Sequence, residues 1–487
     1  MIGAKDASRE ALLALTTLQH RGQDAAGILT LSSEGVHRVR NTGLVESVFN
    51  RENMEELVGD LGLGHTRYST AGRGTLAEVQ PMILTFPFGI GMIHNGNIVN
   101  SDELAQELKS TRRQLLTHSD TEVLLNLFAQ ALTTENNEHL SFETFCKAVK
   151  TLHEKAIGSY SIAAVIADHG LVAFRDPHGI RPIVWGTKVD ATAPGGIAHM
   201  VASETVALEF NGYELKRDIA PGELLYIDVD GGVQTKVLIQ KQARPCMFEW
   251  IYFASPESVI DKIPVYGARI NLGKKLAVLI KERMKAQGLE ADVVVPVPDT
   301  ARIAAISLSE ELGVPYRELL IKNRYIKRTF ILDNQDKRQK AVNMKLSPVK
   351  SEFVGKRVIL VDDSIVRGTT SKKIIELVRN AGATKVYFVS TCPPIKHPCF
   401  YGIDFPNQKE LIAYGRTDAE IEKELGADAV IYQDIEGLRE SIRDAGEGIA
   451  KDFLPCMACL DGKYPTDVST SQRMIERRAT DRKGGQA

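Results

Sequence analysis

The chain has 487 residues, enough for roughly two to four domains, each with an apolar core of its own. Its formal net charge of −2 disfavours functions that depend on a strongly basic surface, such as binding of nucleic acid or anionic membranes. No apolar run is as long as a membrane helix and no signal-peptide pattern opens the chain, so we expect a cytoplasmic protein without nucleic-acid or membrane partners.

The first half of the chain has the pattern of a β-rich layered domain. Residues 11–18 predict a short helix that ends before Gly22, and residues 120–134 predict a longer one. Short apolar runs separated by Gly and Asn turns predict strands. These runs lie at 25–31, 62–70, 88–97, 159–167 and 170–176.

The second half alternates continuous apolar strands with helices, which is typical of a parallel sheet covered on both faces. Strands are predicted at 293–298, 314–319, 356–363, 385–391 and 429–433, and helices at 301–312 and 371–382. The sequence has no long repeat or low-complexity linker, so we expect the two halves to pack directly together.

The string VILVDDSIVRGTTS, residues 358–371, joins a predicted strand to a helix through a turn of small residues. Such a turn points backbone N–H groups and a helix N-terminus at one place, which suits a phosphate. Asp362 and Asp363 end the strand, and paired carboxylates suit Mg²⁺ or the vicinal hydroxyls of a sugar. An acidic turn that merely caps the helix is the alternative, which the full string disfavours.

This string resembles the phosphoribosyltransferase signature, in which the loop holds the 5-phosphate of 5-phosphoribosyl pyrophosphate (PRPP) and the acids contact the ribose. The resemblance implies that PRPP is bound by Asp362, Asp363, Ser364, Arg367, Gly368, Thr369, Thr370 and Ser371.

Two further segments belong to the expected PRPP site. Asp299 follows a strand and would cap the next helix, and Thr300 adds a hydroxyl. In the enzymes that the chain resembles, this turn faces the pyrophosphate, which implies that Asp299 binds PRPP and that Thr300 joins the paired acids as a Mg²⁺ ligand. The long polar stretch 322–346 resembles a lid that closes over the substrate, with Lys322 and Arg324 on PRPP.

Four strings in the first half complete the pattern, although each is weak alone, because HNGN could be a plain turn. They are LQHRGQDAAGI (18–28), GHTRYST (64–70), HNGN (94–97) and HSDTEV (118–123). In this order they resemble the class II glutamine amidotransferase domain, an N-terminal-nucleophile glutaminase. Together with PHGIRP (177–182), KNRY (322–325) and the phosphate loop, they resemble the amidophosphoribosyltransferase family over nearly the whole chain.

The resemblance implies a mixed α/β and α+β protein of two domains. Residues 1–240 would form a class II glutaminase, an Ntn-type αββα sandwich that lacks its N-terminal strand and nucleophile. Residues 241–470 would form a type I phosphoribosyltransferase domain, a parallel sheet flanked by helices. Residues 471–487 are expected to be a mobile charged tail. A homo-oligomer, by resemblance a tetramer, and feedback inhibition by purine nucleotides are also implied.

The same resemblance assigns the glutamine site. Arg67 is expected to bind the α-carboxylate of glutamine and Asp120 its α-ammonium group. The side chain of Asn95 and the backbone N–H of Gly96 are expected to form the oxyanion hole. Arg21 is expected to support this site.

The nucleophile of the family, a cysteine at the mature N-terminus, is not found in this sequence. The chain begins Met1-Ile2-Gly3-Ala4, and we expect that the sequence starts a few residues late. As written, it should use ammonia rather than glutamine. Cys146 lies in a helical region and is expected to be a small core residue instead of a substitute nucleophile.

The remaining cysteines suggest a second kind of site. Cys456 and Cys459 form a C-x-x-C pair in a loop context, and Cys246 and Cys399 can complete a set of four thiolates. Chemistry alone leaves Zn²⁺, an iron–sulfur cluster and unliganded thiols open. The resemblance implies a structural [4Fe–4S] cluster on these four residues, without Cys392.

The implied reaction is amination of PRPP by glutamine nitrogen to 5-phosphoribosylamine, the first committed step of purine synthesis. Ammonia released at the first site would reach the second inside the protein. Two alternatives remain: an ammonia-dependent phosphoribosyltransferase with a vestigial glutaminase half, and a nucleotide sensor without catalysis. The near-zero charge and the lack of a DNA-binding segment disfavour the sensor.

Overall fold

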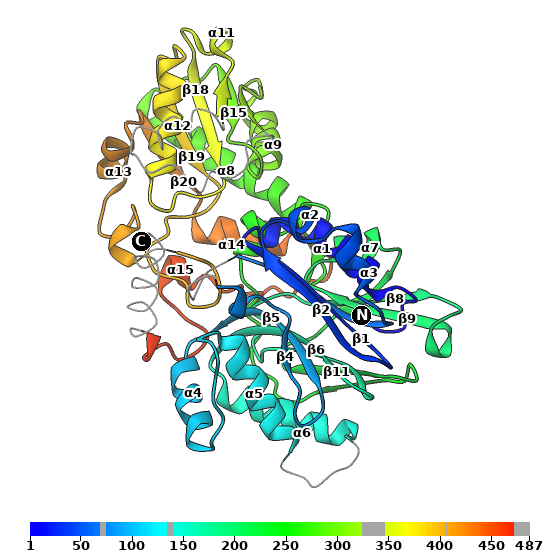
Figure 1. Ribbon diagram of the computed structural model, residues 1–487. Coiled ribbons are helices and arrows are strands. Elements are labelled where there is room, and N and C mark those ends of the chain that lie inside the picture. The colour runs from blue at the N-terminus through cyan, green and yellow to red at the C-terminus, as the bar shows by residue number, and fades with distance from the viewer. Residues whose placement is uncertain (69–74, 134–139, 324–345, 406, 472–487) are drawn as a thin grey trace.

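The computed structural model describes residues 1–68, 75–133, 140–323, 346–405 and 407–471, which form two lobes (Figure 1). The first half of the chain builds the lower lobe, and the second half builds the upper lobe and the junction between them. The expected tail from residue 472 and most of the expected lid, 324–345, lie outside the described residues. In the part of the chain that is described, no helix is long and apolar enough to cross a membrane.

Two antiparallel sheets face each other in the lower lobe. The first has the strand order β12 (Val233–Val237), β11 (Glu223–Asp228), β7 (Gly170–Arg175), β6 (Gly158–Ile166), β5 (Ile90–Ile98), β4 (Met82–Leu84). The second has two parts, β2 (Gly35–Thr42), β1 (Ala25–Ser32), β3 (Leu61–Arg67) and β10 (Glu214–Asp218), β8 (Val184–Val189), β9 (Ile197–Ala202). Ile2 connects these parts, because it bridges His199 of β9 and Leu61 of β3.

Helices cover the outer face of each sheet and confirm the αββα sandwich. The second sheet is covered by α1 (Ala7–Thr17) and α7 (Thr205–Phe210), and the first by α4 (Ser101–Ser110), α5 (Asp120–Leu132) and α6 (Phe142–Lys155). Leu29, Leu63 and Val165 belong to the core between the sheets. Strands β6 and β7 are buried along their whole length, and their sequences are mostly apolar. Shorter elements of this lobe are η1 (Gln19–Arg21), α2 (Val45–Val48), α3 (Arg51–Glu55), η2 (Leu76–Glu78) and η3 (Pro194–Gly196).

The upper lobe contains a parallel sheet in the order β15 (Val293–Pro296), β18 (Arg357–Asp362), β19 (Lys385–Ser390), β20 (Ala429–Tyr432). One face packs against α8 (Val265–Gln287) and α9 (Arg302–Leu312), and the other against α12 (Thr369–Asn380) and α13 (Asp418–Leu425). The helices therefore flank the parallel sheet as expected, and the carboxyl end of β18 carries the paired acids to one edge of it.

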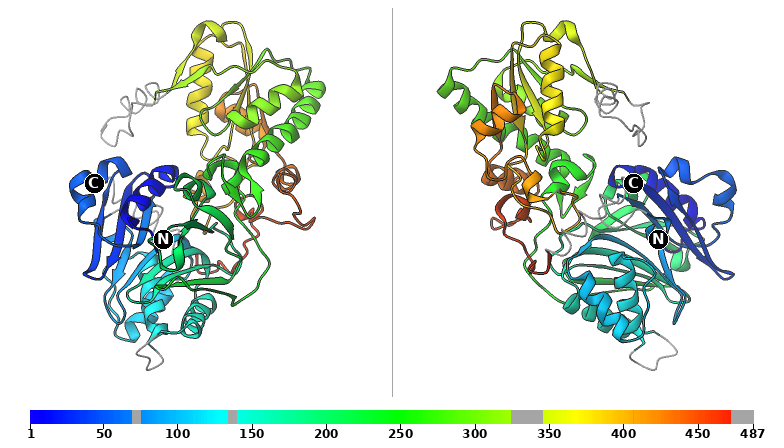
Figure 2. Two further views of the ribbon diagram at one scale, coloured as in Figure 1. Left: turned by 90° about the vertical axis from the view of Figure 1, so that its right-hand side faces the viewer. Right: turned by 60° about the vertical axis from the view of Figure 1, so that its left-hand side comes forward.

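Shorter elements connect the lobes and frame the second half. A π-helix, η4 (Glu249–Phe253), follows the last strand of the lower lobe. The others are β13 (Val259–Ile260), β14 (Ile263–Pro264), β16 (Leu320–Lys322), β17 (Leu346–Pro348), α11 (Lys350–Phe353), η5 (Gln408–Glu410), α14 (Ile435–Arg443) and α15 (Ala458–Asp461). The proposed domain boundary at residue 240 lies between β12 and η4. In both turned views of Figure 2, the two lobes are seen as separate bodies.

Three predictions of local structure were wrong or incomplete. Residues 314–319 do not form a strand, because they contact β15 through a single bridge, between Tyr316 and Val294, and Pro315 has no N–H to donate. Helix α8 was not predicted. The C-x-x-C pair is only partly in a loop, since Cys459 lies within α15.

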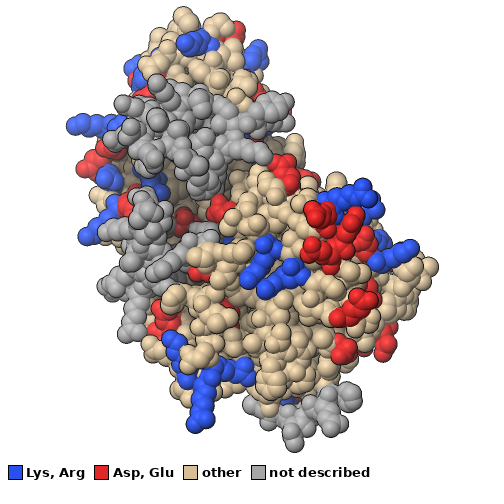
Figure 3. Space-filling model, in the orientation of Figure 1, with Lys and Arg blue, Asp and Glu red and all other residues tan. Residues whose placement is uncertain are grey.

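On the face shown in Figure 3, basic and acidic side chains lie interspersed, in keeping with the small net charge.

Candidate active site

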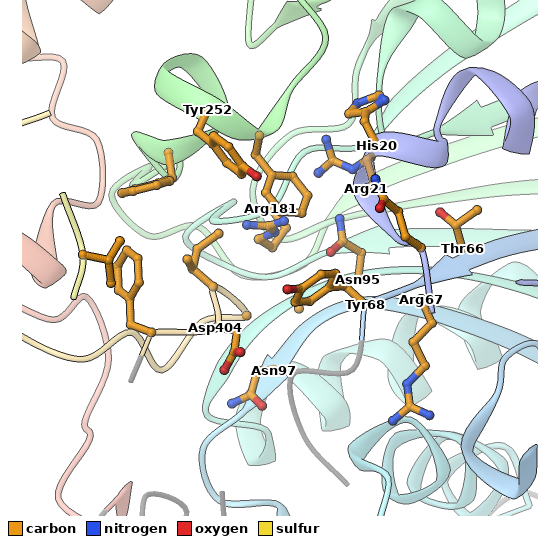
Figure 4. Close-up of a pocket in the computed structure, with 18 of the residues that line it drawn as sticks. His20, Arg21, Thr66, Arg67, Tyr68, Asn95, Asn97, Arg181, Tyr252 and Asp404 are labelled. Atoms are coloured by element: carbon orange, nitrogen blue, oxygen red, sulfur yellow. The ribbon is translucent and has the colours of Figure 1, made fainter. Parts of the chain in front are cut away.

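A cavity of about 530 Å³ lies where the lobes meet, and both halves of the chain line it. All five expected glutamine-site residues line it: Arg21, Arg67, Asn95, Gly96 and Asp120. The expected PRPP loop lines it with Asp362, Asp363, Ser364, Arg367, Gly368, Thr369, Thr370 and Ser371. In Figure 4, Arg21 and Arg67 lie on one side of this space, and Tyr252 and Asp404 on the other. The two predicted sites thus open into one cavity.

Strand β5 carries Asn95 and Gly96 to the cavity wall. The buried Nδ2 of Asn95 has no hydrogen-bond partner among the described residues, so this donor can serve a ligand. Gly96 has a φ of +148°, and a Cβ there would lie 2.1 Å from the carbonyl oxygen of Ser159, so only glycine fits. Both features are compatible with the expected oxyanion hole.

Asp120, the first residue of α5, is an anion at the cavity wall. Its Oδ2 accepts a hydrogen bond from the Ile98 N–H at 3.2 Å, and its Oδ1 lies 3.7 Å from His94 Nδ1. Burial opposes ionisation of Asp120, but His94 and the backbone donors outweigh it and hold the pKa below its ordinary value. The carboxylate is therefore charged at neutral pH, as binding of an ammonium group requires.

Arg67 ends β3 and lies against a buried carboxylate. Its Nη2 is 3.2 Å from Oε2 of Glu78, which is only 4% exposed. This ion pair orients the guanidinium group beside the cavity, where it can reach a second carboxylate.

Arg21 is held by a network of buried ions at the junction of the lobes. Its guanidinium group pairs with Glu249 of η4 at 2.9 Å and also with Glu204. Glu204 accepts further hydrogen bonds from the Ser255 N–H and the Ser258 hydroxyl, both at 2.8 Å. Arg21 therefore ties the glutaminase half to the start of the second half, which is more than the local support that the sequence predicted.

Substitution of Glu204 should weaken this junction. Burial raises the pKa of Glu204, but Arg21 and His20 outweigh it and lower that pKa to about 2. We expect Glu204→Gln to lower the free energy of unfolding at pH 7 by about 3 kcal/mol, because Arg21 loses a buried partner. Because the pKa of Glu204 is lower in the folded than in the unfolded protein, its ionised form stabilises the fold. This stabilisation is complete above pH 4.5 and is lost as the pH falls towards 2.

Urea unfolding at pH 7 and at pH 4 tests this expectation. Glu214→Gln is the control, since that side chain is 79% exposed and pairs only at the surface, with Lys216. Equal stability of the two variants at pH 7 would contradict the role given to the junction.

The phosphate loop requires a glycine at one position. Gly368 has a φ of +75°, and a Cβ there would lie 2.3 Å from Cδ1 of Ile412. The N-terminus of α12 follows directly at Thr369, so its backbone N–H groups face the cavity end of the loop. The loop has the local structure of an anion site.

The paired acids at the end of β18 are buried side by side. Burial raises the pKa of Asp362 well above its ordinary value, and Asp363 raises it further. Burial also raises the pKa of Asp363, although hydrogen bonds from the hydroxyls of Thr300 and Ser364 act against this. Two buried carboxylates with raised pKa values need a nearby cation to ionise. Their oxygens and the hydroxyl of Thr300 are the hard donors that Mg²⁺ prefers.

The structure gathers only part of the outer PRPP site. Thr300 contacts Asp363, as expected. Lys322 Nζ donates to Oδ2 of Asp299 at 2.6 Å, but these two residues do not line the cavity. Arg324 lies outside the described residues.

Comparison with known proteins agrees with this geometry. Residues 65–209 match the glutamine amidotransferase domain family, and residues 268–399 match the phosphoribosyl transferase domain family. The chain is 45% identical to the amidophosphoribosyltransferase of Pseudomonas aeruginosa over 96% of its own length and 92% of the relative. The chain belongs to the amidophosphoribosyltransferase family.

Other relatives agree. The Escherichia coli amidophosphoribosyltransferase is 46% identical over 88% of this chain and 85% of its own. The solved glutamine PRPP amidotransferase of B. subtilis, complexed with ADP and GMP, is 38% identical, with a TM-score of 0.83 and 96% of each chain covered. Amidophosphoribosyltransferases aminate PRPP with nitrogen from glutamine in the first step of purine biosynthesis, so the expected fold and function are confirmed.

The four cysteines of the expected cluster come together from distant segments. Cys246 and Cys456 form a parallel bridge, and the Cys459 carbonyl accepts N–H groups from Lys396 and His397, just before Cys399. All four are buried, and burial raises the pKa of Cys246 to about 12. Among the described residues, however, no three or more Cys, His, Asp or Glu side chains are arranged as ligands of one metal ion.

Several cavity residues at the junction of the two lobes were not predicted from the sequence. Arg181, within the quoted PHGIRP string, pairs with Glu249 at 3.1 Å and had no role assigned. Both guanidinium groups also lie near the Phe253 ring, with the Arg21 and Arg181 Cζ atoms 4.7 and 4.9 Å from its centre. Gly402 was missed as well, and its only signal was its place after Cys399.

Proposed function

We propose that this chain carries out the family's reaction in the cavity shared by its two lobes, joining nitrogen to C1 of PRPP. The observation that supports this most is the cavity itself, which is lined by the expected glutamine-site residues and by the phosphate loop. An intermediate released on one side would have a direct path to the other through this cavity.

In the first half, we assign glutamine binding to the residues on the cavity wall. Arg67 binds the α-carboxylate and Asp120 the α-ammonium group. The Asn95 side chain and the Gly96 N–H stabilise the oxyanion. Arg21 acts indirectly, by fixing η4 and its Phe253 ring beside the cavity.

In the second half, the loop from Ser364 to Ser371 holds the 5-phosphate, and Asp362 and Asp363 hold the ribose hydroxyls. Asp299, Lys322 and Arg324 are assigned to the pyrophosphate side. The C1–N bond forms as the C1–O bond to pyrophosphate breaks, and the nitrogen releases a proton. Mg²⁺, which would be held by Thr300, Asp362 and Asp363, would neutralise charge on the leaving pyrophosphate.

The nitrogen donor depends on a nucleophile that the described cavity does not contain. No cysteine is among the described residues that line it. We therefore propose that this cavity turns over PRPP with ammonia and not with glutamine.

Release of pyrophosphate from PRPP in the presence of Mg²⁺ and either NH₄Cl or L-glutamine tests both parts. Turnover with NH₄Cl alone is the expected result. Turnover with glutamine would overturn the proposal on the nitrogen donor. No turnover with either would favour the nucleotide sensor.

We also propose that Cys246, Cys399, Cys456 and Cys459 hold a structural [4Fe–4S] cluster. The support is their common buried position and their donor type, since they are four of the five thiols within one apolar core. Such a cluster would hold three chain segments together and would make the protein sensitive to oxygen. It supplies no electron to the reaction.

By analogy with the B. subtilis enzyme complexed with ADP and GMP, we propose that purine nucleotides inhibit this chain. A tetramer is proposed on family resemblance, and light scattering of the purified protein tests it.

A further inference from the structure

A short segment of the second half, residues 400–405, lies directly on the strand that carries the expected oxyanion hole. Asn97 of β5 donates its Nδ2 hydrogen to the Phe400 carbonyl at 2.9 Å, although the two residues are 303 positions apart. Ser159 of β6 donates its hydroxyl hydrogen to the Tyr401 carbonyl at 2.8 Å. Both hydrogen bonds are buried, so the segment is fixed to both strands of this pair.

The next residue, Gly402, lies against the backbone of Gly96. It has a φ of +103°, and a Cβ there would lie 3.2 Å from the Gly96 carbonyl oxygen and 3.4 Å from the Gly96 Cα. On its other side, Gly96 is confined by the Ser159 carbonyl. The Gly96 backbone is therefore confined by Ser159 of the first half and by Gly402 of the second.

The segment is also anchored within the second half, so it cannot simply follow β5. The Tyr401 hydroxyl is 2.9 Å from that of Thr466, and the Tyr401 N–H points at the Cys399 sulfur, 3.4 Å away. The Phe405 ring packs edge-on against Phe248, with 5.2 Å between the ring centres. Residues 402–405 line the cavity, and Figure 4 shows Asp404 beside Asn97.

We propose that Gly402 is a positioning residue for the oxyanion hole, fixing the Gly96 peptide from the side of the phosphoribosyltransferase half. This inference rests on the proposed role of Gly96. Hydrogen-bond donors stabilise an oxyanion only over a narrow range of distances, so a shift of a few tenths of an ångström at Gly96 weakens the site.

Gly402→Ala tests the proposal, because the new Cβ pushes on Gly96 and the positive φ strains any other residue. Gly415→Ala is the matched control. Gly415 has a φ of +68°, but a Cβ there meets no atom within 4 Å, so the control has the backbone strain without the contact.

Two measurements are made on the full chain: L-glutamine affinity by calorimetry and hydrogen–deuterium exchange of the β5 peptide. The donors proposed for the oxyanion would also meet the side-chain carbonyl oxygen of bound glutamine, from which the oxyanion forms. We therefore expect Gly402→Ala to bind glutamine about tenfold more weakly than Gly415→Ala, and its β5 amides to exchange faster. Equal affinity and equal exchange in the two variants would overturn the proposal.

NH₄Cl-dependent turnover reports whether the second half of each variant is folded. If Gly402→Ala is inactive in that assay, Ser159→Ala decides, because it removes only the hydrogen bond to Tyr401. For that variant we expect about fivefold weaker glutamine binding and faster β5 exchange, and no change in either refutes the inference. If the unsubstituted chain binds no glutamine, the proposed glutamine site is wrong, while the exchange data still decide whether Gly402 positions Gly96.

Discussion

Asp363→Asn should reduce ammonia-dependent turnover of PRPP about a hundredfold, since that factor corresponds to about 2.8 kcal/mol and a hydrogen bond to a charged group contributes about 1.5–3 kcal/mol. The amide keeps the shape of the side chain and can still accept the Thr300 hydrogen bond. The amide has no negative charge, so its interaction with a sugar hydroxyl or with Mg²⁺ would be weaker.

The assay is pyrophosphate release at saturating NH₄Cl, with the PRPP concentration varied. Asp452→Asn is the control, because that carboxylate is exposed and outside the cavity. Normal turnover by Asp363→Asn would refute the assignment of the acids, whereas normal turnover by Asp452→Asn is expected.

Protein purified without oxygen should be brown and contain stoichiometric iron. Cys459→Ser should lose the colour and the iron. Because ligand binding to a site formed by three segments contributes directly to folding, this variant should also lose on the order of 5 kcal/mol of unfolding free energy. Iron analysis, the visible spectrum and urea unfolding measure these effects.

Cys146→Ala is the matched control for loss of a buried thiol. Cys146 lies in α6, in the core of the other lobe, so this variant should keep its colour and iron. A colourless protein that contains zinc would contradict the iron–sulfur proposal and favour a zinc site on the same four residues.

Local sequence signals located most of the architecture. The continuous apolar strands β15, β18, β19 and β20 were predictable, because burial on both faces of a parallel sheet leaves no polar alternation. Helix α8 was not, since Gly273 in its middle and the buried Arg269 interrupt the amphipathic pattern. Gly273 is needed there because a Cβ would lie 2.1 Å from the Ala304 carbonyl of α9, which only the fold reveals.

In the site, too, some residues could be predicted from local sequence and others only from the fold. Arg67, Asn95 and Asp120 stand in strings that resemble a known family, so they could be named without a structure. Their partners could not, because Glu78 stands in no recognisable motif and Glu249, the partner of Arg21, lies far along the chain. Contacts between distant segments, such as Asn97 with Phe400, leave no local pattern in the sequence.

The two-sided confinement of Gly96 bears on attempts to divide this enzyme. A fragment ending before η4 would retain both sheets of the sandwich, yet Gly96 would lose the neighbour that Gly402 provides. Arg21 would also keep only one of its two carboxylate partners. Such a fragment is expected to fold with a misaligned pocket, so the second half serves the first as part of its scaffold.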